Sequence, residues 1–179
     1  GRLLDELARQ GKRCVCELLP VGGVAPNVLS YHLQVLREAW DKSAVHTHVS
    51  EPRLALTEPA LYVLADRRRL LLAISNLLKN ACTFTPASGR IELSVAGTPN
   101  EAHVTITDTG CGIAGADLRS IFEAFYQADA SLTRPNDGLG VGLTIAEALV
   151  RLHDGHIWAE SDGPGRGSTF HVRLPLVQR

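Results

Sequence analysis

Leu70-Leu-Leu-Ala-Ile-Ser-Asn-Leu-Leu-Lys-Asn-Ala81 is a run of good helix-forming residues around which the rest of the chain can be placed. Its composition and apolar spacing predict a helix over residues 67–83. Asn76 and Asn80 lie four residues apart, so both carboxamides project from one face of that helix. A carboxamide oxygen is a hard ligand that can complete the shell of Mg²⁺, although an isolated Asn pair is more often a hydrogen-bonded polar stripe.

A second polar position stands at the end of a predicted strand. Residues 102–108 alternate as a half-buried strand does, and Thr109-Gly-Cys-Gly112 follows as a turn with two flexible positions. Asp108 could accept a hydrogen bond from an exocyclic amine and so select adenine, while the glycines let the backbone approach a flat ligand. The alternatives are an ordinary turn or half of an aspartic protease site. A protease needs a second catalytic Asp, and no second Asp-Thr-Gly occurs in the chain.

A glycine-rich segment, Gly138-Leu-Gly-Val-Gly142, opens the apolar helical stretch predicted over residues 141–153. Free backbone N–H groups and the helix dipole make such a helix start a ready site for phosphate. A dinucleotide-binding fingerprint would need a glycine where the chain has Ile145, so that interpretation fails. Phe122-Glu-Ala-Phe-Tyr126 and a polar stretch over residues 129–137 precede the glycines, and the polar stretch has the composition of a surface loop.

In this order the segments resemble the N, G1, F and G2 boxes of the catalytic ATP-binding domain of sensor histidine kinases. That family shares a superfamily with DNA gyrase, the heat-shock chaperone ATPases and the mismatch-repair ATPases. The resemblance covers residues 45–176 and includes the closing segment Gly163-Pro-Gly-Arg-Gly-Ser-Thr-Phe170. It implies ATP and Mg²⁺ as cofactors and transfer of the γ-phosphoryl group to a phosphoacceptor His. It implies two partners, a His-bearing dimerisation hairpin and the receiver domain of a response regulator.

The resemblance also implies a role for individual residues. Asn80 would bind magnesium through ATP, and Asp108 would contact adenine. Asn76 stands where hydrolysing relatives carry a water-activating Glu; because an amide is no general base, phosphoryl transfer is favoured over rapid hydrolysis. The implied catalytic residues are Asn76 and Asn80, and the implied nucleotide contacts are Asn80, Asp108, Gly110, Gly112, Ile113, Phe125, Arg134, Gly138, Leu139, Gly140, Gly142, Leu143 and Thr169.

Two positions depart from the pattern of that family. Thr83 stands where many of these kinases carry a Lys that helps to neutralise the phosphates, and Gln127 stands where Arg is frequent. Lys79 is close in sequence but points about 100 degrees away from Asn80 around the helix. Either phosphate binding is weaker than in those kinases, or Arg134 supplies the missing charge.

Residues 1–42 form a separate short segment whose sequence pattern predicts three short helices interrupted by glycines. Residues 1–39 resemble the helix-turn-helix core of the arsenic-responsive metalloregulator repressors, in which a Cys-Val-Cys helix precedes the recognition helix. Cys14 and Cys16 are therefore a candidate soft-metal pair, with small thiols in a reduced cytosol as the alternative. No basic wing follows, and the net charge of −1 disfavours DNA binding. The segment is also too short and broken for a phosphoacceptor hairpin, so autophosphorylation by this chain alone is not expected.

Composition predicts one principal globular domain over residues 43–179: the chain has 179 residues, of which 45% are hydrophobic and 21% charged. No apolar run approaches the roughly 20 residues that span a bilayer, and no signal peptide is visible, so we expect a cytoplasmic protein. The expected architecture is a two-layer α/β sandwich, a mixed sheet with helices on one face. Its expected strands cover residues 60–65, 90–97, 102–108, 155–161 and 167–174, and its expected helices cover 67–83, 116–122 and 141–153.

The function expected from the sequence is an Mg-ATP-binding catalytic domain of the histidine-kinase type. Two alternatives stay open at this point. One is a nucleotide-dependent regulator that binds ATP without transferring phosphate, and the other is a DNA-binding, thiol- or metal-responsive regulator acting through residues 1–39. A homodimer is a further expectation for the assembled protein.

Overall fold

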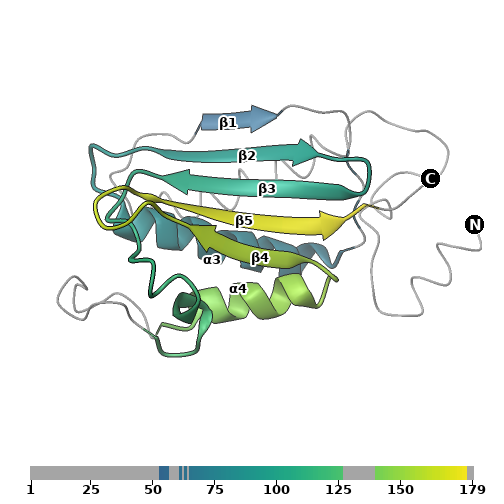
Figure 1. Ribbon diagram of the computed structural model, residues 1–179. Coiled ribbons are helices and arrows are strands. Elements are labelled where there is room, and N and C mark those ends of the chain that lie inside the picture. Colours follow the sequence, from purple (N-terminus) through teal and green to yellow (C-terminus); the bar gives the residue numbers. More distant parts are fainter. Residues whose placement is uncertain (1–52, 57–60, 62, 64, 127–139, 177–179) are drawn as a thin grey trace, which may run out of the picture.

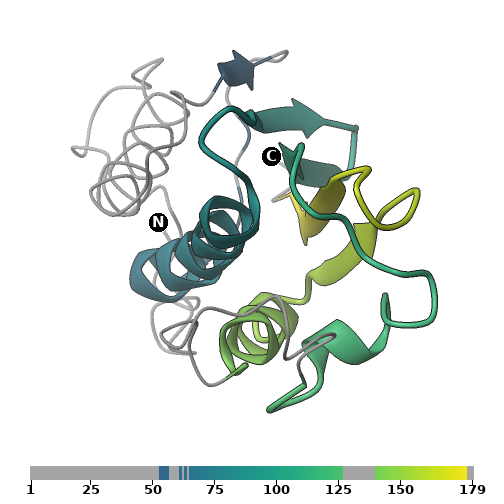
Figure 2. The same cartoon turned by 90° about the vertical axis from the view of Figure 1, so that its left-hand side faces the viewer.

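The computed structural model describes residues 53–56, 61, 63, 65–126 and 140–176. Two helices lie side by side against one face of a single sheet, and the end-on view shows the two layers (Figures 1 and 2). This is the α/β sandwich that the sequence predicts. Its elements are β1 (Arg53–Leu56), α3 (Arg67–Phe84), β2 (Ile91–Gly97), β3 (Glu101–Asp108), the 3-10 turn η2 (Ser120–Phe122), α4 (Gly142–Arg151), β4 (His156–Glu160) and β5 (Ser168–Pro175).

The sheet has the strand order β1-β2-β3-β5-β4. The short β1 runs parallel to β2, and the other neighbours are antiparallel, so the sheet is mixed as expected. The central strand β3 ends at Asp108, which lies opposite Ile91 on one side and Ser168 on the other. The last residue of β3 is therefore held between two strands, and its position is fixed by the ladder on both sides.

The core lies between the sheet and the helices because the buried strand residues alternate with exposed or half-buried ones. Burying such apolar side chains supplies the main driving force for folding, at roughly 25 cal/mol per Å². The largest side chains that are fully buried are Phe170, Ile74, Leu77, Leu78, Ile91, Ile106, Val150 and Val172.

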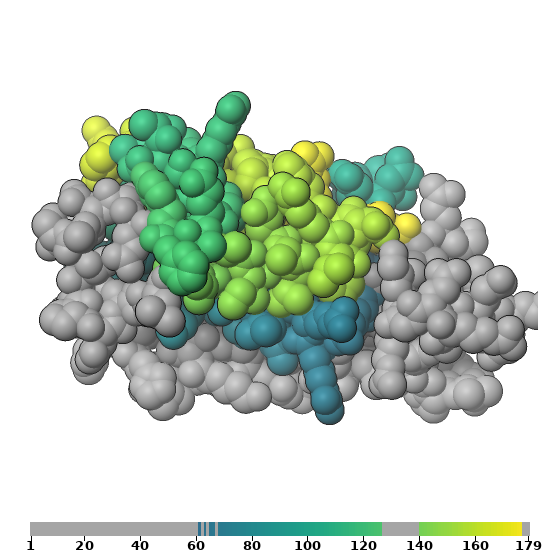
Figure 3. Space-filling model, turned by 90° about the horizontal axis from the view of Figure 1, so that it is seen from below, coloured from purple at the N-terminus to yellow at the C-terminus, as the bar shows by residue number. Residues whose placement is uncertain are grey.

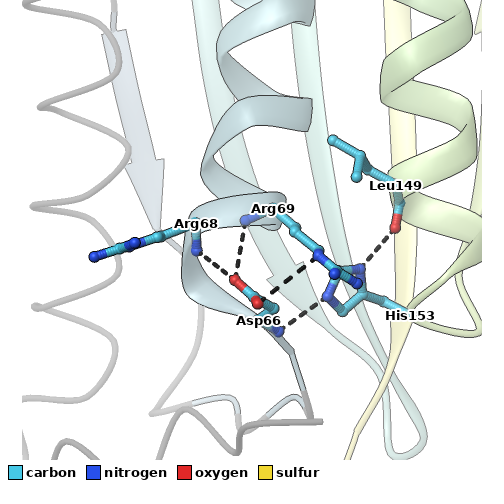
Figure 4. A network of polar contacts seen from close by, with 5 residues as sticks. All are labelled: Asp66, Arg68, Arg69, Leu149 and His153. Carbon is cyan, nitrogen blue, oxygen red and sulfur yellow. Dashed lines mark hydrogen bonds and ion pairs between the residues drawn. The ribbon is translucent and has the colours of Figure 1, made fainter. Parts of the chain in front are cut away.

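A polar network joins the start of α3 to the end of α4 (Figure 4). The Asp66 carboxylate caps α3 by accepting from the backbone N–H groups of Arg68 and Arg69, at 2.9 and 3.2 Å. These hydrogen bonds lower the pKa of Asp66, and the one from Arg69 has the larger effect. The Asp66 N–H donates to Nε2 of the buried His153 at 2.9 Å, and the His153 Nδ1–H donates to the Leu149 carbonyl at 2.6 Å. The imidazole thus links both helices.

The other ends of the two helices meet below the end of β3. Gly142, the first residue of α4, faces the side chain of Asn76, and the Cys111 N–H donates to the carbonyl of Phe84 at the last turn of α3. The two helices run antiparallel, and the C-terminal half of α3 and the start of α4 lie at the same end of the sandwich as the end of β3 (Figure 1).

Most elements agree with the sequence prediction to within a residue or two, and two differ. The helix expected near residues 116–122 is wrong: only η2 forms, because so short a stretch after Gly115 gains too few hydrogen bonds to nucleate an α-helix. Strand β1 was not anticipated. Of the strand expected over residues 60–65, only residues 61, 63 and 65 are described, and Val63 makes a single antiparallel bridge to Leu176.

Candidate functional site

The candidate site is built around the buried carboxylate of Asp108, which is 4% exposed. Its Oδ1 accepts from the Gly110 N–H at 2.8 Å, and its Oδ2 accepts from the Ser168 hydroxyl at 2.5 Å. A carboxylate has about four lone-pair sites, so these two donors leave acceptor capacity unused. A buried anion with spare acceptor capacity suits a ligand that donates a hydrogen bond.

Three glycines let the backbone close around this carboxylate. A Cβ on Gly110 would lie 2.4 Å from the carbonyl oxygen of Phe84, and one on Gly167 would lie 2.1 Å from that of Asp108. Gly112 has a φ of +71°, and a Cβ there would lie 2.2 Å from the Gly163 carbonyl oxygen. Any side chain at these positions would displace backbone, so the glycines are required by close approach.

Backbone hydrogen bonds join the loop after β3 to the loop between β4 and β5. The Gly165 N–H donates to the Cys111 carbonyl at 2.6 Å, and the Gly167 N–H donates to the Gly110 carbonyl at 3.2 Å. Residues 109–113 are therefore held between the last turn of α3 and the second loop. This arrangement forms a floor beside Asp108 that is made mainly of backbone.

Asn76 and Asn80 are both half-buried on α3. The Asn76 amide nitrogen is buried and has no hydrogen-bond partner within the described part of the chain. A Cβ on Gly142 would lie 3.9 Å from the Asn76 Oδ1, so this amide faces the start of α4. The N-cap residue Val141 offers no side-chain acceptor to the first N–H groups of that helix. The Asn76 side chain and the start of α4, which has no side-chain cap, thus lie next to one another.

The residues on either side of the segment 127–139 lie in contact. The Phe125 N–H donates to the Gly140 carbonyl at 3.2 Å, and both residues adopt positive φ. The Phe125 side chain is 74% exposed. The Tyr126 hydroxyl donates to the Asp117 carboxylate at 2.7 Å, a contact that raises the pKa of the phenol. Figure 3 shows α4 and the green segment that ends at residue 126 together on this surface.

The structure brings most of the expected site residues to one end of the sandwich. Ile113 and Leu143 pack against the core there. Thr169 is placed differently, because its hydroxyl donates to that of Thr107 on the sheet face opposite α3 and α4. Ser168 supplies the hydroxyl that meets Asp108, and sequence reasoning missed it. The alternation of buried residues along β5 was the available signal, since Ser168 shares a face with Phe170.

Several expected positions lie outside the described residues: Arg134, Gly138, Leu139, Gln127 and the pair Cys14 and Cys16. Of the described cysteines, Cys82 is buried and Cys111 is exposed. Partial burial raises the pKa of the Cys111 thiol, which disfavours a reactive thiolate. Thr83 and Lys79 are both exposed.

Within the described ranges, no group of three or more His, Cys, Asp or Glu side chains is arranged to hold a metal ion. None of the helices described combines the length and the apolarity that crossing a membrane would require.

Residues 65–178 match the family described as histidine kinase-, DNA gyrase B-, and HSP90-like ATPase. The chain belongs to this family. Among curated relatives, the adaptive-response sensory kinase SasA of a Synechococcus species is 37% identical over 145 residues, or 80% of this chain. The sensor histidine kinase WalK of Bacillus subtilis is 34% identical over 125 residues, or 69% of this chain. The chain spans only 37% and 20% of the lengths of these two relatives.

Solved structures agree with this assignment. The mycobacterial sensor histidine kinase MprB aligns with a TM-score of 0.72 at 26% identity, covering 83% of this chain and 97% of that chain. Full-length ShkA in complex with AMPPNP aligns with a TM-score of 0.69 at 26% identity, covering 99% of this chain and 36% of that chain. The domain is a histidine-kinase-type ATPase domain. The resemblance of residues 1–39 to arsenic-responsive repressors finds no support in these comparisons, and that segment lies outside the described residues.

Proposed function

We propose that this domain binds Mg-ATP and supplies its γ-phosphoryl group to a phosphoacceptor His on a partner hairpin. The observation that carries the proposal is the buried Asp108 carboxylate, which keeps unused acceptor capacity beside a backbone floor. Family membership and the AMPPNP complex of the similar kinase ShkA support the nucleotide assignment. Because the chain spans a minor part of its curated relatives, the hairpin and the receiver domain are proposed as partners.

Asp108 would select adenine by hydrogen-bond polarity. The exocyclic amine of adenine is a donor, and it complements the free lone pairs of a carboxylate that already accepts from Gly110 and Ser168. Guanine presents a carbonyl oxygen at the same place, and two acceptors facing one another in a buried site repel. Gly110, Gly112 and Ile113 would lie under the ring, where the first two carry no side chain to obstruct it.

The phosphates would lie toward the start of α4. Gly140, Gly142 and Leu143 belong to that region, and Phe125 lies at its edge. We assign Arg134, Gly138 and Leu139 to the same end of the nucleotide from their place in the sequence, and we assign Thr169 no direct contact. The missing partner of the Asn76 amide nitrogen supports an anionic ligand at this place.

Magnesium, when bound, would neutralise part of the negative charge of the phosphates. Asn80 would offer it a carboxamide oxygen, a hard ligand of the type that Mg²⁺ accepts beside phosphates and water. The absence of a carboxylate-rich cluster within the described residues fits a metal held mainly by its substrate. Since Thr83 carries no charge, phosphate binding would depend on this metal more than it does where a Lys stands at that position.

Transfer would rest on positioning and charge neutralisation, because phosphoryl transfer requires little covalent chemistry from the protein. Asn76 cannot remove a proton from water, so hydrolysis should be slow compared with transfer to a well-placed His. We place this activity in the cytoplasm, where ATP is available. The acceptor hairpin would also bring two copies of the protein together.

Isothermal titration with a non-hydrolysable ATP analogue, with and without Mg²⁺, tests this function. We expect magnesium-dependent binding by the unmodified chain, its loss in Asn80→Ala, and a weakening of about a hundredfold in Asp108→Asn. Lys79→Ala is the matched control, because Lys79 is the neighbour of Asn80 on α3 and is exposed. Unchanged affinity in both Asn80→Ala and Asp108→Asn would overturn the pocket assignment.

A further inference from the structure

Ser161 is the first residue of the loop between β4 and β5, one of the two loops that form the floor beside Asp108, and it is half-buried. Its hydroxyl accepts from the Ile113 N–H at 3.0 Å and from the Gly163 N–H at 3.2 Å. The same hydroxyl lies 2.6 Å from the Gly167 carbonyl oxygen, to which it donates its only hydrogen. One small side chain therefore uses its donor and both acceptor positions to join backbone groups.

Of these three contacts, the one with Ile113 joins the two loops, and the other two fix the shape of the loop between β4 and β5. Ile113 belongs to the loop after β3, while Gly163 and Gly167 begin and end the turn before β5. Gly167 precedes Ser168, whose hydroxyl donates to Asp108. Ser161 thus acts on both sides of the Asp108 carboxylate, through the loop that contains Gly110 and through the residue next to Ser168.

We propose that Ser161 is a positioning residue that fixes the floor of the base pocket and thereby enforces the preference for adenine over guanine. This inference rests on the proposed function and deepens it. Ser161 makes no contact with the Asp108 carboxylate, so its effect is transmitted through backbone groups. It is separate from the residues that would hold the phosphates and the metal.

The physical reason lies in what replaces the hydroxyl when it is removed. Ser161→Ala leaves two N–H donors and one carbonyl acceptor without their partner, and water must enter to satisfy them. The remaining links, from Gly165 to Cys111 and from Gly167 to Gly110, keep the loops together but allow them to separate locally. A floor that can shift lets the base move relative to Asp108, so the donor–acceptor selection described above becomes less strict.

The test measures dissociation constants for a non-hydrolysable ATP analogue and the matching GTP analogue, with Mg²⁺, by isothermal titration. The chains are the unmodified protein, Ser161→Ala, Ser161→Thr and Ser94→Ala. Ser161→Thr retains the hydroxyl, and Ser94 is a half-buried serine on the sheet face opposite α3 and α4. We expect Ser161→Ala to weaken ATP-analogue binding about tenfold and to lower the ratio of GTP-analogue to ATP-analogue dissociation constants by a similar factor. Ser161→Thr should restore most of that ratio, and Ser94→Ala should leave it unchanged.

A merely structural role would reduce the fraction of active protein and leave the ratio of the two constants untouched. An unchanged ratio in Ser161→Ala, or one that falls equally in Ser94→Ala, would overturn the inference. Amide hydrogen exchange without nucleotide gives a second criterion, since the Ile113 and Gly163 amides should exchange faster in Ser161→Ala. If the unmodified chain binds neither analogue, the proposed function fails. If that chain binds the ATP analogue but the exchange rates of these two amides do not change, the role of Ser161 alone fails.

Discussion

The two faces of the sheet are stabilised in different ways, although the same strands form both. Along β5, Phe170 and Val172 are 0% exposed against the helices, whereas His171 and Arg173 point to the other face. The covered face gains from apolar burial, which needs no specific partner. The open face must satisfy polar side chains in contact with solvent. Asp108 and Ser168 are polar residues on the covered face, and the candidate site lies where they interrupt its apolar surface.

The open face carries an aromatic ladder, which we define as His103, His156, Trp158, His171 and Arg173. The Trp158 and His171 rings stack with centroids 4.6 Å apart and planes 8° apart, and the Arg173 guanidinium lies 4.6 Å from the Trp158 centroid. His103 Nε2 lies 3.2 Å from His171 Nδ1, and the Trp158 Nε1–H donates to the Glu160 carboxylate at 2.9 Å. Such contacts contribute modestly and depend on solvent.

The largest expected difference between the faces comes from truncating one aromatic residue on each. Phe170→Ala would remove a fully buried ring and leave a cavity, so we expect a loss of about 3–5 kcal/mol in the free energy of unfolding. Trp158→Ala removes a larger side chain from the open face, and we expect only about 1–2 kcal/mol. Urea unfolding of both variants measures this. Equal losses in the free energy of unfolding would show that the aromatic ladder stabilises the fold as much as the buried core does.

The second comparison concerns two glycines in the loop before β5. Gly167→Ala would place a Cβ 2.1 Å from the Asp108 carbonyl oxygen at a φ of +73°, so the end of β3 must move. We expect a loss of about 2–4 kcal/mol in stability together with weakened nucleotide binding.

Gly165→Ala is the matched control for this change. Gly165 has a φ of +77°, but a Cβ there would meet nothing within 4 Å. Only backbone strain applies, and we expect a loss of about 1 kcal/mol with nucleotide affinity retained. Denaturant unfolding and titration with the ATP analogue measure both variants. Loss of affinity in Gly165→Ala as well would mean that loop strain, and not contact with Asp108, controls the site.

A third comparison uses a histidine from each side of the sheet. His153→Ala removes the ring that links the Asp66 N–H to the Leu149 carbonyl, and both groups lose their partner (Figure 4). We expect a loss of about 1–3 kcal/mol. His156→Ala removes an exposed ring of the ladder, and we expect less than about 0.5 kcal/mol. A thermal or urea unfolding curve for each variant suffices, and similar losses would contradict a specific role for the link between the helices.

The sequence predicted the covered face well and the open face poorly, for a physical reason. The alternation of Ile, Leu, Val and Phe records which side chains avoid water, so β2, β3, β5 and the two long helices could be placed. Asp108 was singled out because a carboxylate at a strand end precedes two glycines, and its predicted role came from the resemblance to histidine kinases. Ser168 and Ser161 were missed because a serine has no signature of its own and acquires its partners only when β4 and β5 pair. The stacking of the ladder likewise depends on register between three strands, which a linear pattern does not contain.

The smallest expected effect is a dependence of stability on pH that arises from the open face. Partial burial lowers the pKa of both His103 and His171; the charge of Arg173 acts in the same direction, and Glu160 opposes it. As pH falls below about 6.5, the unfolded chain therefore binds protons more readily than the folded chain, so stability should fall. Stability should keep falling with pH until the rings are also protonated in the folded state, and it should then stop depending on these two histidines. Because both rings are partly solvated, we expect less than about 1 kcal/mol.

This expectation is tested by the midpoints of urea unfolding at about pH 7.5 and about pH 5.5, which bracket the usual imidazole pKa. The double variant His103→Gln, His171→Gln should show a flatter dependence on pH than the unmodified chain. The hydrogen bond from Trp158 is the main cause that lowers the pKa of Glu160. Glu160 therefore affects the pH dependence of stability only at more acidic pH, where carboxyl groups begin to bind protons. A slope that is unchanged in the double variant would mean that the open face is uncoupled from folding in this pH range. All of the proton dependence would then have to come from groups elsewhere in the molecule.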